Sequence, residues 1–410
     1  MQLDLNNLVV ALSHAIDFME MDFLGVVSNH SKRVTYIALK IAECLALPPE
    51  ARFDLVALSI LHDNGIGAAF QSIAGTEDED GAPSGAAGLR AAEQAAVHCT
   101  AGEKNIEDYP LLTGAKDIIT YHHENYDGSG FFRLRGESIP LLAQIIRLAD
   151  LAESGSNLRN VDYEGKTKLY EFLEQRSGRI FAPTLLAAFR EAAAYPAFWL
   201  DLQDEFVGAA IHRSAPHFGA RMSFAEIRGA TAVFSRIIDS KSRFTRLHSQ
   251  ELSERAGRMG ERYGMDGEAV AELRIAADLH DLGKLAVSNA ILDKPGGLEP
   301  SEVDAIQRHT YYTRVSLQSI AGFENITEWA ANHHEKLDGS GYPYRLEASR
   351  LDFNSRLMAG LDIYQALTEE RPYREALSHG RSMEILRGLA TQGKLEAGVV
   401  EDIDAVFAGD

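Results

Sequence analysis

Residues 269–281 read Ala-Val-Ala-Glu-Leu-Arg-Ile-Ala-Ala-Asp-Leu-His-Asp, and this stretch decides the fold class. Its apolar residues recur at three- and four-residue spacing, which is the pattern of an amphipathic helix with one buried stripe. The same spacing extends over much of the chain, whereas the alternating pattern of strands is scarce. We therefore expect an all-α protein made of two tandem helical bundles.

The chain contains an internal repeat, which the spacing of its histidines and aspartates reveals. Two histidines separated by the same interval open each copy, and the second of them is followed by aspartate. A third histidine comes next, then a His-His pair that continues as Glu-x-x-Asp-Gly-Ser-Gly, then an aspartate late in an apolar helix. The matched residues are His30, His62, Asp63, His98, His122, His123 and Asp150 in the first copy and His248, His280, Asp281, His309, His333, His334 and Asp362 in the second.

The repeat predicts two domains. Pro183, Pro196 and Pro216 punctuate the end of the first copy, and a fresh helical pattern begins near Phe224 and leads to His248. We expect a first domain over residues 1–215 and a second over residues 216–410, with the boundary placed to within about ten residues. A length of 410 residues also exceeds one ordinary domain core.

Composition narrows the class of partner. The chain is 45% hydrophobic and 24% charged, as in globular proteins. Its formal net charge of −20 repels polyanions, so we expect no binding to long nucleic acid or to anionic membrane surfaces. A small phosphate ligand remains compatible with this charge where metal ions reverse the field locally.

Cysteine content and the N-terminus indicate the compartment. Cys44 and Cys99 are too few for a disulfide framework, and we expect them to behave as buried apolar residues in a reducing cytoplasm. The N-terminus lacks the basic region of a secretory signal. The best apolar run, residues 141–152, is charge-interrupted and too short to cross a bilayer, so we expect a cytoplasmic chain without a membrane segment.

The repeated residues predict a metal centre. Imidazole and carboxylate groups are ligands for divalent ions such as iron, manganese or zinc. A lone buried histidine is more often a core residue, but here the whole set recurs at matched spacing. Two ions about 3.5–4 Å apart, bridged by a carboxylate, would use this many ligands, and such pairs hydrolyse phosphate esters. Because successive helical residues diverge by about 100°, we expect Gly283 to break the helix so that His280 and Asp281 face one pocket.

The second copy also carries short motifs in a characteristic order. They read His280-Asp281-Leu282-Gly283-Lys284, Ile291-Leu292-Asp293-Lys294-Pro295-Gly296, His309, His333-His334-Glu335, Asp338-Gly339-Ser340-Gly341-Tyr342-Pro343 and Arg371-Pro372-Tyr373-Arg374. In this order they closely resemble the HD-GYP family of cyclic dinucleotide phosphodiesterases. The resemblance covers about residues 240–400, and a weaker one covers about residues 20–185.

The resemblance implies HD-domain bundles that hydrolyse cyclic di-GMP or 3'3'-cyclic GMP-AMP with a hydroxide held between two ions. The ions would be divalent transition metals, iron or manganese, with zinc or nickel as alternatives. Some family members bind a third ion through a glutamate four residues before the first histidine, where this chain has Val26 and Phe244. The implied ligands are His248, His280, Asp281 and Asp362 for one ion and His309, His333 and His334 for the other, with Asp281 as the bridge.

The resemblance also implies contacts with the substrate. Lys284 would contact the scissile phosphate, where its charge offsets negative charge on the phosphoryl oxygens. Arg371 and Arg374 suit a phosphate or a guanine edge, although a solvated surface pair is an equal alternative. Tyr342 would belong to a loop that shapes the pocket.

The first copy departs from the family pattern outside its ligand set. It has Ile66 at the position of Lys284 and Phe131-Phe132 in place of Tyr342-Pro343. An acidic stretch at residues 76–88, rich in Gly, Ala and Ser, replaces the Leu-Asp-Lys-Pro-Gly loop, and we expect it to be a mobile linker. Arg159 keeps the interval of Arg371. We expect a degenerate domain with a regulatory or structural role. Its seven ligand-type residues make it a possible second metal site.

Other functions stay open at this stage. An HD-superfamily nucleotidase or triphosphohydrolase shares the His-Asp core, and a non-catalytic cyclic dinucleotide receptor shares the pocket. The sequence leaves open the preferred cyclic dinucleotide, the native metal, the product and the input signal. It leaves homo-oligomerisation open as well.

Overall fold

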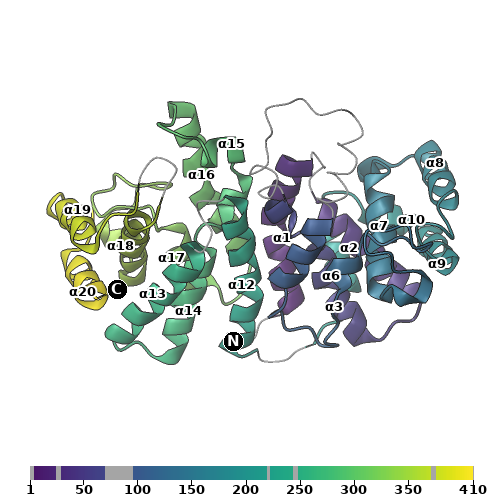
Figure 1. Cartoon of the computed structure of the whole chain (residues 1–410), viewed down its shortest axis with the longest axis horizontal. Helices are drawn as coiled ribbons and strands as arrows, with labels where there is room; N and C mark the ends of the chain where they lie inside the picture. The colour runs from purple at the N-terminus through teal and green to yellow at the C-terminus, as the bar shows by residue number, and fades with distance from the viewer. Residues whose placement is uncertain are drawn as a thin grey trace. The chain divides into compact units, whose positions relative to one another are not determined.

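The computed structural model describes residues 4–24, 29–69, 96–218, 222–242, 248–370 and 375–409. These residues form helices and loops, and helices fill both parts of the chain (Figure 1). Apart from two isolated β-bridges, Ser177 with Phe181 and Asp338 with Glu347, the described ranges contain no strand. The all-α prediction is confirmed.

The chain separates into two compact units, residues 3–220 and residues 221–410, called here the first unit and the second unit. The helices of the first unit are α1 (Leu5–Leu24), α2 (His30–Cys44), α3 (Pro49–Ile60), a helical segment at residues 96–105, α6 (Ile118–Tyr121), α7 (Leu141–Ser154), α8 (Tyr163–Glu174), α9 (Pro183–Ala193), α10 (Pro196–Asp201) and α11 (Val207–Ser214). Short 3₁₀ turns lie at η1 (Gly136–Ser138) and η2 (Leu158–Asn160).

Helix α2 is the centre of the first unit, because it packs against α1, α3, α7, α9 and α11. Almost all of its residues are buried, including two with charged side chains. Lys32 pairs with Asp17 at 3.1 Å, and the Arg33 Nε donates to Glu153 at 2.7 Å. A buried cation is tolerated only with such partners, so these pairs fix the position of α2 against α1 and α7.

The second unit contains α12 (Phe224–Lys241), α13 (His248–Arg262), α14 (Gly267–Leu279), η3 (Leu282–Ala286), α15 (Asn289–Leu292), α16 (Pro300–Leu317), α17 (Glu324–Ala331), η4 (Ala348–Arg350), α18 (Phe353–Thr368), α19 (His379–Thr391) and α20 (Ala397–Phe407). Helix α14 packs against α12, α13 and α17. Asp266 caps its N-terminus by accepting from the Ala269 backbone at 2.8 Å. The apolar stripe read from the sequence therefore lies in the core, where Leu273, Ile275 and Leu279 are fully buried.

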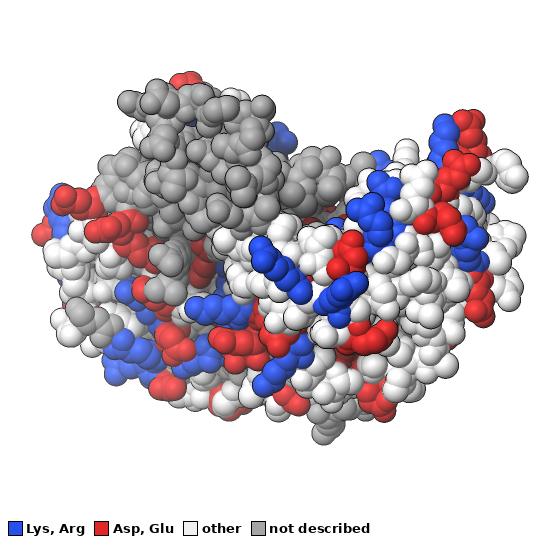
Figure 2. Space-filling model, turned by 45° about the vertical axis from the view of Figure 1, so that its right-hand side comes forward, with Lys and Arg blue, Asp and Glu red and all other residues white. Residues whose placement is uncertain are grey.

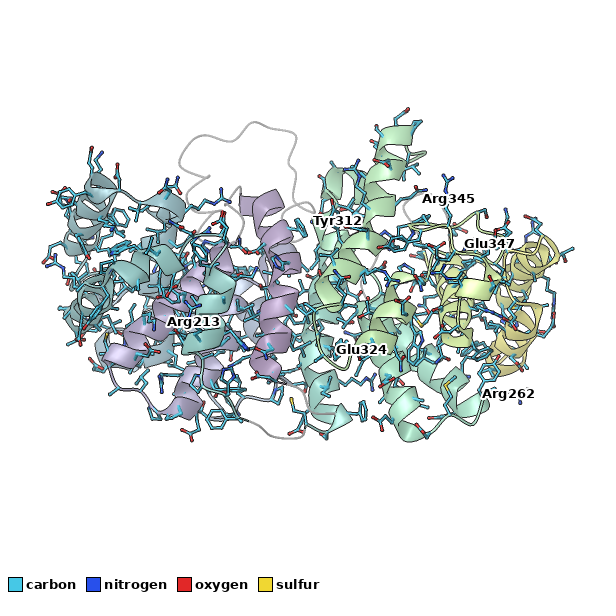
Figure 3. The ribbon with its side chains drawn as sticks, turned by 180° about the vertical axis from the view of Figure 1, so that it is seen from behind. Arg213, Arg262, Tyr312, Glu324, Arg345 and Glu347 are labelled. Carbon is cyan, nitrogen blue, oxygen red and sulfur yellow. The ribbon has the colours of Figure 1, made fainter. Side chains whose placement is uncertain are left out.

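Charged side chains of both signs are mixed on the described part of the face in Figure 2. Arg213 at the end of α11 pairs with Asp201 at 2.7 Å, and Arg262 at the end of α13 pairs with Asp402 at 3.1 Å. Both arginines are labelled in Figure 3. Basic residues in a last helical turn also offset the negative end of the helix dipole. Within the described ranges, no helix has both the length and the apolarity that crossing a bilayer requires.

Replacing Leu273 by alanine should lower the free energy of unfolding by about 2–5 kcal/mol, because a fully buried side chain leaves a cavity. Urea titration followed by circular dichroism measures this change. The control is Glu261→Ala, an exposed position on α13, where the change should stay within about 0.5 kcal/mol. Equal effects of the two variants would contradict the burial of this stripe.

Candidate metal centre

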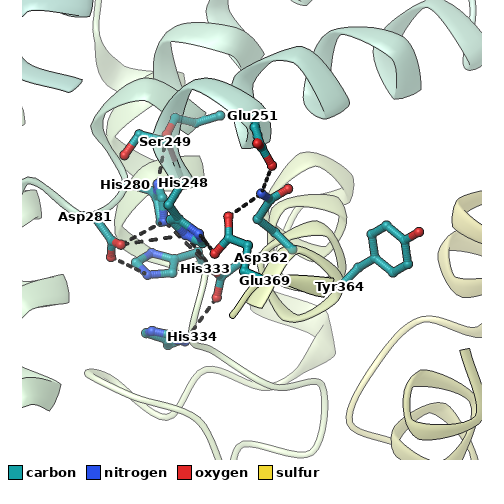
Figure 4. Close-up of polar contacts among 12 residues, drawn as sticks. His248, Ser249, Glu251, His280, Asp281, His333, His334, Asp362, Tyr364 and Glu369 are labelled. Atoms are coloured by element: carbon teal, nitrogen blue, oxygen red, sulfur yellow. Dashed lines mark hydrogen bonds and ion pairs between the residues drawn. The ribbon is translucent and has the colours of Figure 1, made fainter. Parts of the chain in front are cut away.

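The second unit brings together all seven residues that the sequence singled out, from separate segments of the chain. Figure 4 labels these residues except His309. His248 opens α13, and His280 and Asp281 directly follow α14. The others are His309 on α16, His333 and His334 in the turn after α17, and Asp362 on α18. All are buried except His334, which is partly exposed.

Asp281 lies between two groups of histidines. Its Oδ2 is 3.2 Å from the Nε2 of His280 and 3.9 Å from the Nε2 of His248. Its Oδ1 is 3.4 Å from the Nε2 of His309 and 3.7 Å from the Nε2 of His333. Each carboxylate oxygen thus faces a different group, which is the geometry of a bridging ligand.

Asp362 faces both groups as well. Its Oδ1 lies 3.5 Å from the Nε2 of His248 and 3.8 Å from that of His280. Its Oδ2 lies 3.7 Å from the Nδ1 of His334. Two carboxylates and five imidazoles therefore enclose one small volume.

Backbone carbonyls fix the tautomers of three of these histidines. The Nδ1 atoms of His280, His309 and His333 lie 2.8, 2.6 and 2.6 Å from the carbonyl oxygen three residues earlier. A carbonyl only accepts, so each Nδ1 carries the proton and each Nε2 presents a lone pair. This is the arrangement in which proteins hold imidazole ligands of a metal.

The facing lone pairs test whether the residues fit a metal ion. The Nε2 atoms of His309 and His333 lie 3.2 Å apart. Two acceptors at this distance repel each other unless a cation lies between them. The Nε2 of His280 and the Oδ1 of Asp281 are buried and make no hydrogen bond. The donor set therefore fits divalent cations, as the chemistry of its groups requires.

Electrostatics keep His309, His334 and Asp281 in the forms that bind metal. Burial lowers the pKa of His309 to about 4 and that of His334 to about 3, so both imidazoles are neutral near pH 7. Burial alone would raise the pKa of Asp281, but His280 and the ammonium of Lys284 hold it well below its ordinary value. The Lys284 Nζ donates to the Asp281 Oδ2 at 2.6 Å. Metal ions bind neutral imidazole and ionised carboxylate.

The first unit builds a similar arrangement from its own seven residues. Asp63 again lies between two groups, with Oδ2 3.5 Å from the Nε2 of His62 and Oδ1 3.4 and 3.5 Å from the Nε2 atoms of His98 and His122. Carbonyls three residues earlier accept from the Nδ1 of His62 and of His122 at 2.8 and 2.6 Å. The residues grouped closely enough to share an ion are His30, His62 and Asp150 on one side and His98, Cys99, His122 and His123 on the other.

Comparison with known proteins agrees with this geometry. The family model of the HD domain matches residues 21–153 and again residues 232–399. The chain belongs to the HD domain family. HD domains bind divalent metal ions, and each match includes clusters of histidine and carboxylate that suit them.

Several relatives of this HD-domain chain carry named activities. It is 30% identical over 400 residues to the 3'3'-cGAMP-specific phosphodiesterase 1 of Vibrio cholerae, which covers 96% of this chain and 89% of that protein. It is 32% identical over 166 residues to the cyclic di-GMP phosphodiesterase response regulator RpfG of Xanthomonas campestris, which covers 39% of this chain and 43% of that protein.

A solved structure shares the fold. The crystal structure of a cyclic GMP-AMP specific phosphodiesterase of Vibrio cholerae matches with a TM-score of 0.68 and 23% identity, over 100% of this chain and 99% of that chain. The likeness extends over the length of both chains. At this identity it supports the HD-type helical fold of this chain.

One expectation about the HD motif is wrong. Gly283 was expected to break the helix, but α14 ends at Leu279, before the motif. Gly283 instead allows close packing, because a Cβ there would lie 2.0 Å from the carbonyl oxygen of His309. Gly65 has the same role in the first HD domain, where a Cβ would lie 2.1 Å from the carbonyl oxygen of His98.

Sequence reasoning missed several residues around the two HD centres. Glu369 accepts from the Nδ1 of His248 at 2.8 Å, and Glu153 pairs with the Nδ1 of His30 at 2.5 Å. These glutamates orient the first histidine of each copy. They follow Asp362 and Asp150 by different intervals, so the repeat gave no signal for them.

Some predicted features lie outside the described residues. They are Arg371 and Arg374, Val26 and Phe244, and the stretch at residues 76–88. Arg159 is described, and its Nε pairs with Asp204 at 3.1 Å. Ile66 is buried in the first unit at the sequence position that Lys284 has in the second.

Replacing Gly283 by alanine should reduce the metal content of the second unit, because the new methyl group would displace the backbone of His309. Elemental analysis of the purified variant measures the loss. Gly297→Ala is the matched control, since a Cβ there meets no atom within 4 Å. Full metal content in a folded Gly283→Ala variant would show that the packing at this position does not hold the ligand in place.

Removing the HD pair itself is a more direct test. Protein purified without chelator should contain at least two equivalents of transition metal per chain, because each group of ligands in the second unit suits one ion. The double variant His280→Ala with Asp281→Ala should lose about two equivalents, since Asp281 faces both groups. Unchanged metal content would contradict the ligand assignment.

Proposed function

We propose that this chain is a metal-dependent phosphodiesterase that hydrolyses a cyclic dinucleotide, and that the second unit is its catalytic unit. The observation that carries the proposal is the position of Asp281, whose two oxygens face two separate groups of imidazoles. Two divalent ions, when bound, activate water for attack on phosphorus and neutralise charge on the phosphoryl oxygens.

The chain's own residues would divide the work as follows. His248, His280 and Asp362 would hold one ion, and His309, His333 and His334 the other, with Asp281 shared. Iron or manganese suits this nitrogen and oxygen set, with zinc and nickel as alternatives. Glu369 holds the Nδ1 of His248, and backbone carbonyls hold three further rings. The ligands are therefore oriented before any ion arrives.

Lys284 would contact the scissile phosphate. Its ammonium lies 2.6 Å from the Oδ2 of Asp281, and its side chain is 18% exposed. It therefore stands, like the partly exposed His334, at the solvent-reachable edge of the cluster. A positive charge held there stabilises negative charge that grows on phosphoryl oxygens.

A pocket beside the ligands would receive one half of the substrate. Its volume is about 620 Å³, within the range of small-molecule sites. Tyr342 lines it, and the Tyr342 ring lies 4.9 Å from the ring of His334, centroid to centroid. Arg345, labelled in Figure 3, also lines it. The remaining lining residues are Asp304, Gln307, Arg308, Tyr311, Gly339, Ser340, Gly341 and Pro343.

The relatives indicate the substrate. A match over 96% of the chain with a 3'3'-cGAMP-specific phosphodiesterase supports 3'3'-cyclic GMP-AMP as the substrate. The shorter match to a cyclic di-GMP phosphodiesterase makes cyclic di-GMP the second compound to test. Two tyrosines and two arginines around one pocket suit a purine base next to a phosphate.

The assay compares substrates and metals on the full chain. Protein loaded with iron, manganese, zinc or nickel is incubated with 3'3'-cyclic GMP-AMP, cyclic di-GMP or nucleoside triphosphates, and the products are separated by chromatography. We expect turnover of a cyclic dinucleotide to a linear dinucleotide or to mononucleotides. If the protein hydrolyses only nucleoside triphosphates, it is a triphosphohydrolase. If it binds a cyclic dinucleotide and releases no product, it is a receptor.

The two units should differ in their effect on turnover. Asp281→Ala should abolish hydrolysis, whereas Asp63→Ala should leave most of it, because the first unit lacks a counterpart of Lys284.

Lys284→Ala should lower kcat by about 10²–10³-fold, as the loss of one preorganised charge does. Circular dichroism of each variant is the control for folding. A folded Asp63→Ala variant as inactive as Asp281→Ala would make the first unit catalytic or tightly coupled.

A further inference from the structure

The first unit places an arginine beside its candidate metal ligands. Arg147 lies on α7, three residues before Asp150. Its Nη1 donates to the Nδ1 of His123 at 2.9 Å and lies 3.9 Å from the Oδ2 of Asp150. One guanidinium thus contacts both the last histidine and the last aspartate of the first set of seven residues.

The contact with Arg147 decides the tautomer of His123. A guanidinium has donors and no acceptor, so the Nδ1 of His123 accepts this hydrogen bond, and its ring proton is on Nε2. Neither nitrogen then offers the free lone pair that a metal ligand needs. His123 lies close enough to His98 and His122 to share an ion with them. The hydrogen bond from Arg147 nevertheless excludes it from metal binding.

The matched residues of the second unit face each other without an arginine. The Nδ1 of His334 lies 3.7 Å from the Oδ2 of Asp362. Two ligand atoms bound to one ion at about 2.0–2.2 Å lie roughly 3–4 Å apart. The residue three positions before Asp362 is Ala359, which has no polar side-chain atom. The same two ligand positions are thus left for a metal ion in the second unit and are held by a cationic side chain in the first.

A neighbouring position differs in the same sense. The Nη2 of Arg147 donates to the Oδ1 of Asn125 at 3.4 Å. The second unit has Lys336 at the position of Asn125, since each follows the first histidine of its His-His pair by the same interval. An amide oxygen accepts from a guanidinium, whereas an ammonium repels it. The first copy therefore combines its arginine with an acceptor, and the second combines Ala359 with a lysine.

The other side of the first centre keeps its ligands. His30, His62 and Asp150 lie close enough to share one ion. Glu153 holds the Nδ1 of His30, and the Nε2 of this ring lies 3.6 Å from the Oδ1 of Asp150. Arg147 approaches the other oxygen of Asp150. The first unit therefore retains a set of ligands for one ion, next to a fixed positive charge that repels a second ion.

We propose that Arg147 takes the place of one of the two metal ions in the first unit, which therefore holds a single ion between His30, His62, Asp63 and Asp150. A single ion lacks the paired cations that stabilise both the attacking and the leaving oxygen in phosphate-ester hydrolysis. The first unit then has a structural or regulatory ion, whatever reaction the second unit performs.

The number of manganese ions per chain tests this assignment without an activity assay. The double change His280→Ala with Asp281→Ala removes the second centre, so the metal that remains belongs to the first unit. After reloading with manganese, elemental analysis should find about one equivalent in this background and about two when Arg147→Ala is added. Electron paramagnetic resonance should show an isolated ion in the background and an exchange-coupled pair after Arg147→Ala. Arg159→Ala is the matched control, because this arginine pairs with Asp204, and it should leave the count at one.

The last histidine of each set supplies a second comparison. His123→Ala should leave the metal content of the parent chain unchanged, because Arg147 already holds that ring. His334→Ala, the same position in the second unit, should lose about one equivalent.

The parent chain decides the outcome where circular dichroism shows that a variant fails to fold. It should bind about three equivalents of manganese, one of them uncoupled. The proposal is overturned if the parent binds four equivalents or only coupled pairs, or if the background without the second centre holds two ions or none. It is also overturned if Arg147→Ala adds no ion, or if His123→Ala loses as much metal as His334→Ala.

Discussion

A buried carboxylate between two sets of imidazoles is the constraint on which the second unit depends. Asp281 is 1% exposed, and transferring an ionised carboxylate out of water is costly unless positive charge surrounds it. Lys284 supplies one positive charge, and the surrounding histidines bring their ring nitrogens close to both carboxylate oxygens. The helices that bring these groups together therefore form a scaffold that suits divalent cations. Folding and metal binding are coupled in such a scaffold.

Most of the candidate site was predictable from the sequence because the same set of histidines and aspartates occurs in both copies of the repeat. A ligand whose position is fixed relative to its neighbours recurs at a fixed interval, and all seven residues of each copy were found in this way. The helical pattern before His280 also predicted a buried stripe, and the structure places Leu273 and Leu279 in the core. The spacing of apolar residues thus identified the helices, and recurrence in two copies identified the histidines and aspartates of the candidate site.

Contacts that differ between the copies were not predictable. Glu369 and Glu153 reach the same kind of atom from unequal distances along the chain, so no common interval marks them. Arg147 reaches His123 from a helix that is adjacent only in three dimensions. The function of Gly283 was misjudged for a related reason, because its neighbour is the backbone of His309, which no local pattern reveals. Sequence spacing reports positions along one element, and tertiary contacts between elements need coordinates.

The close approach at Gly65 and Gly283 affects how the His-Asp-x-Gly motif is read. In both units this glycine serves packing against a helix that carries a ligand, and it touches no reacting group. The first unit keeps it although its neighbour is Ile66 instead of a lysine. A glycine at this position therefore marks a chain segment that is built to fit against a second helix, whether or not chemistry takes place there. The residue that follows the glycine, Lys284 in one unit and Ile66 in the other, is the position at which the two motifs differ in charge.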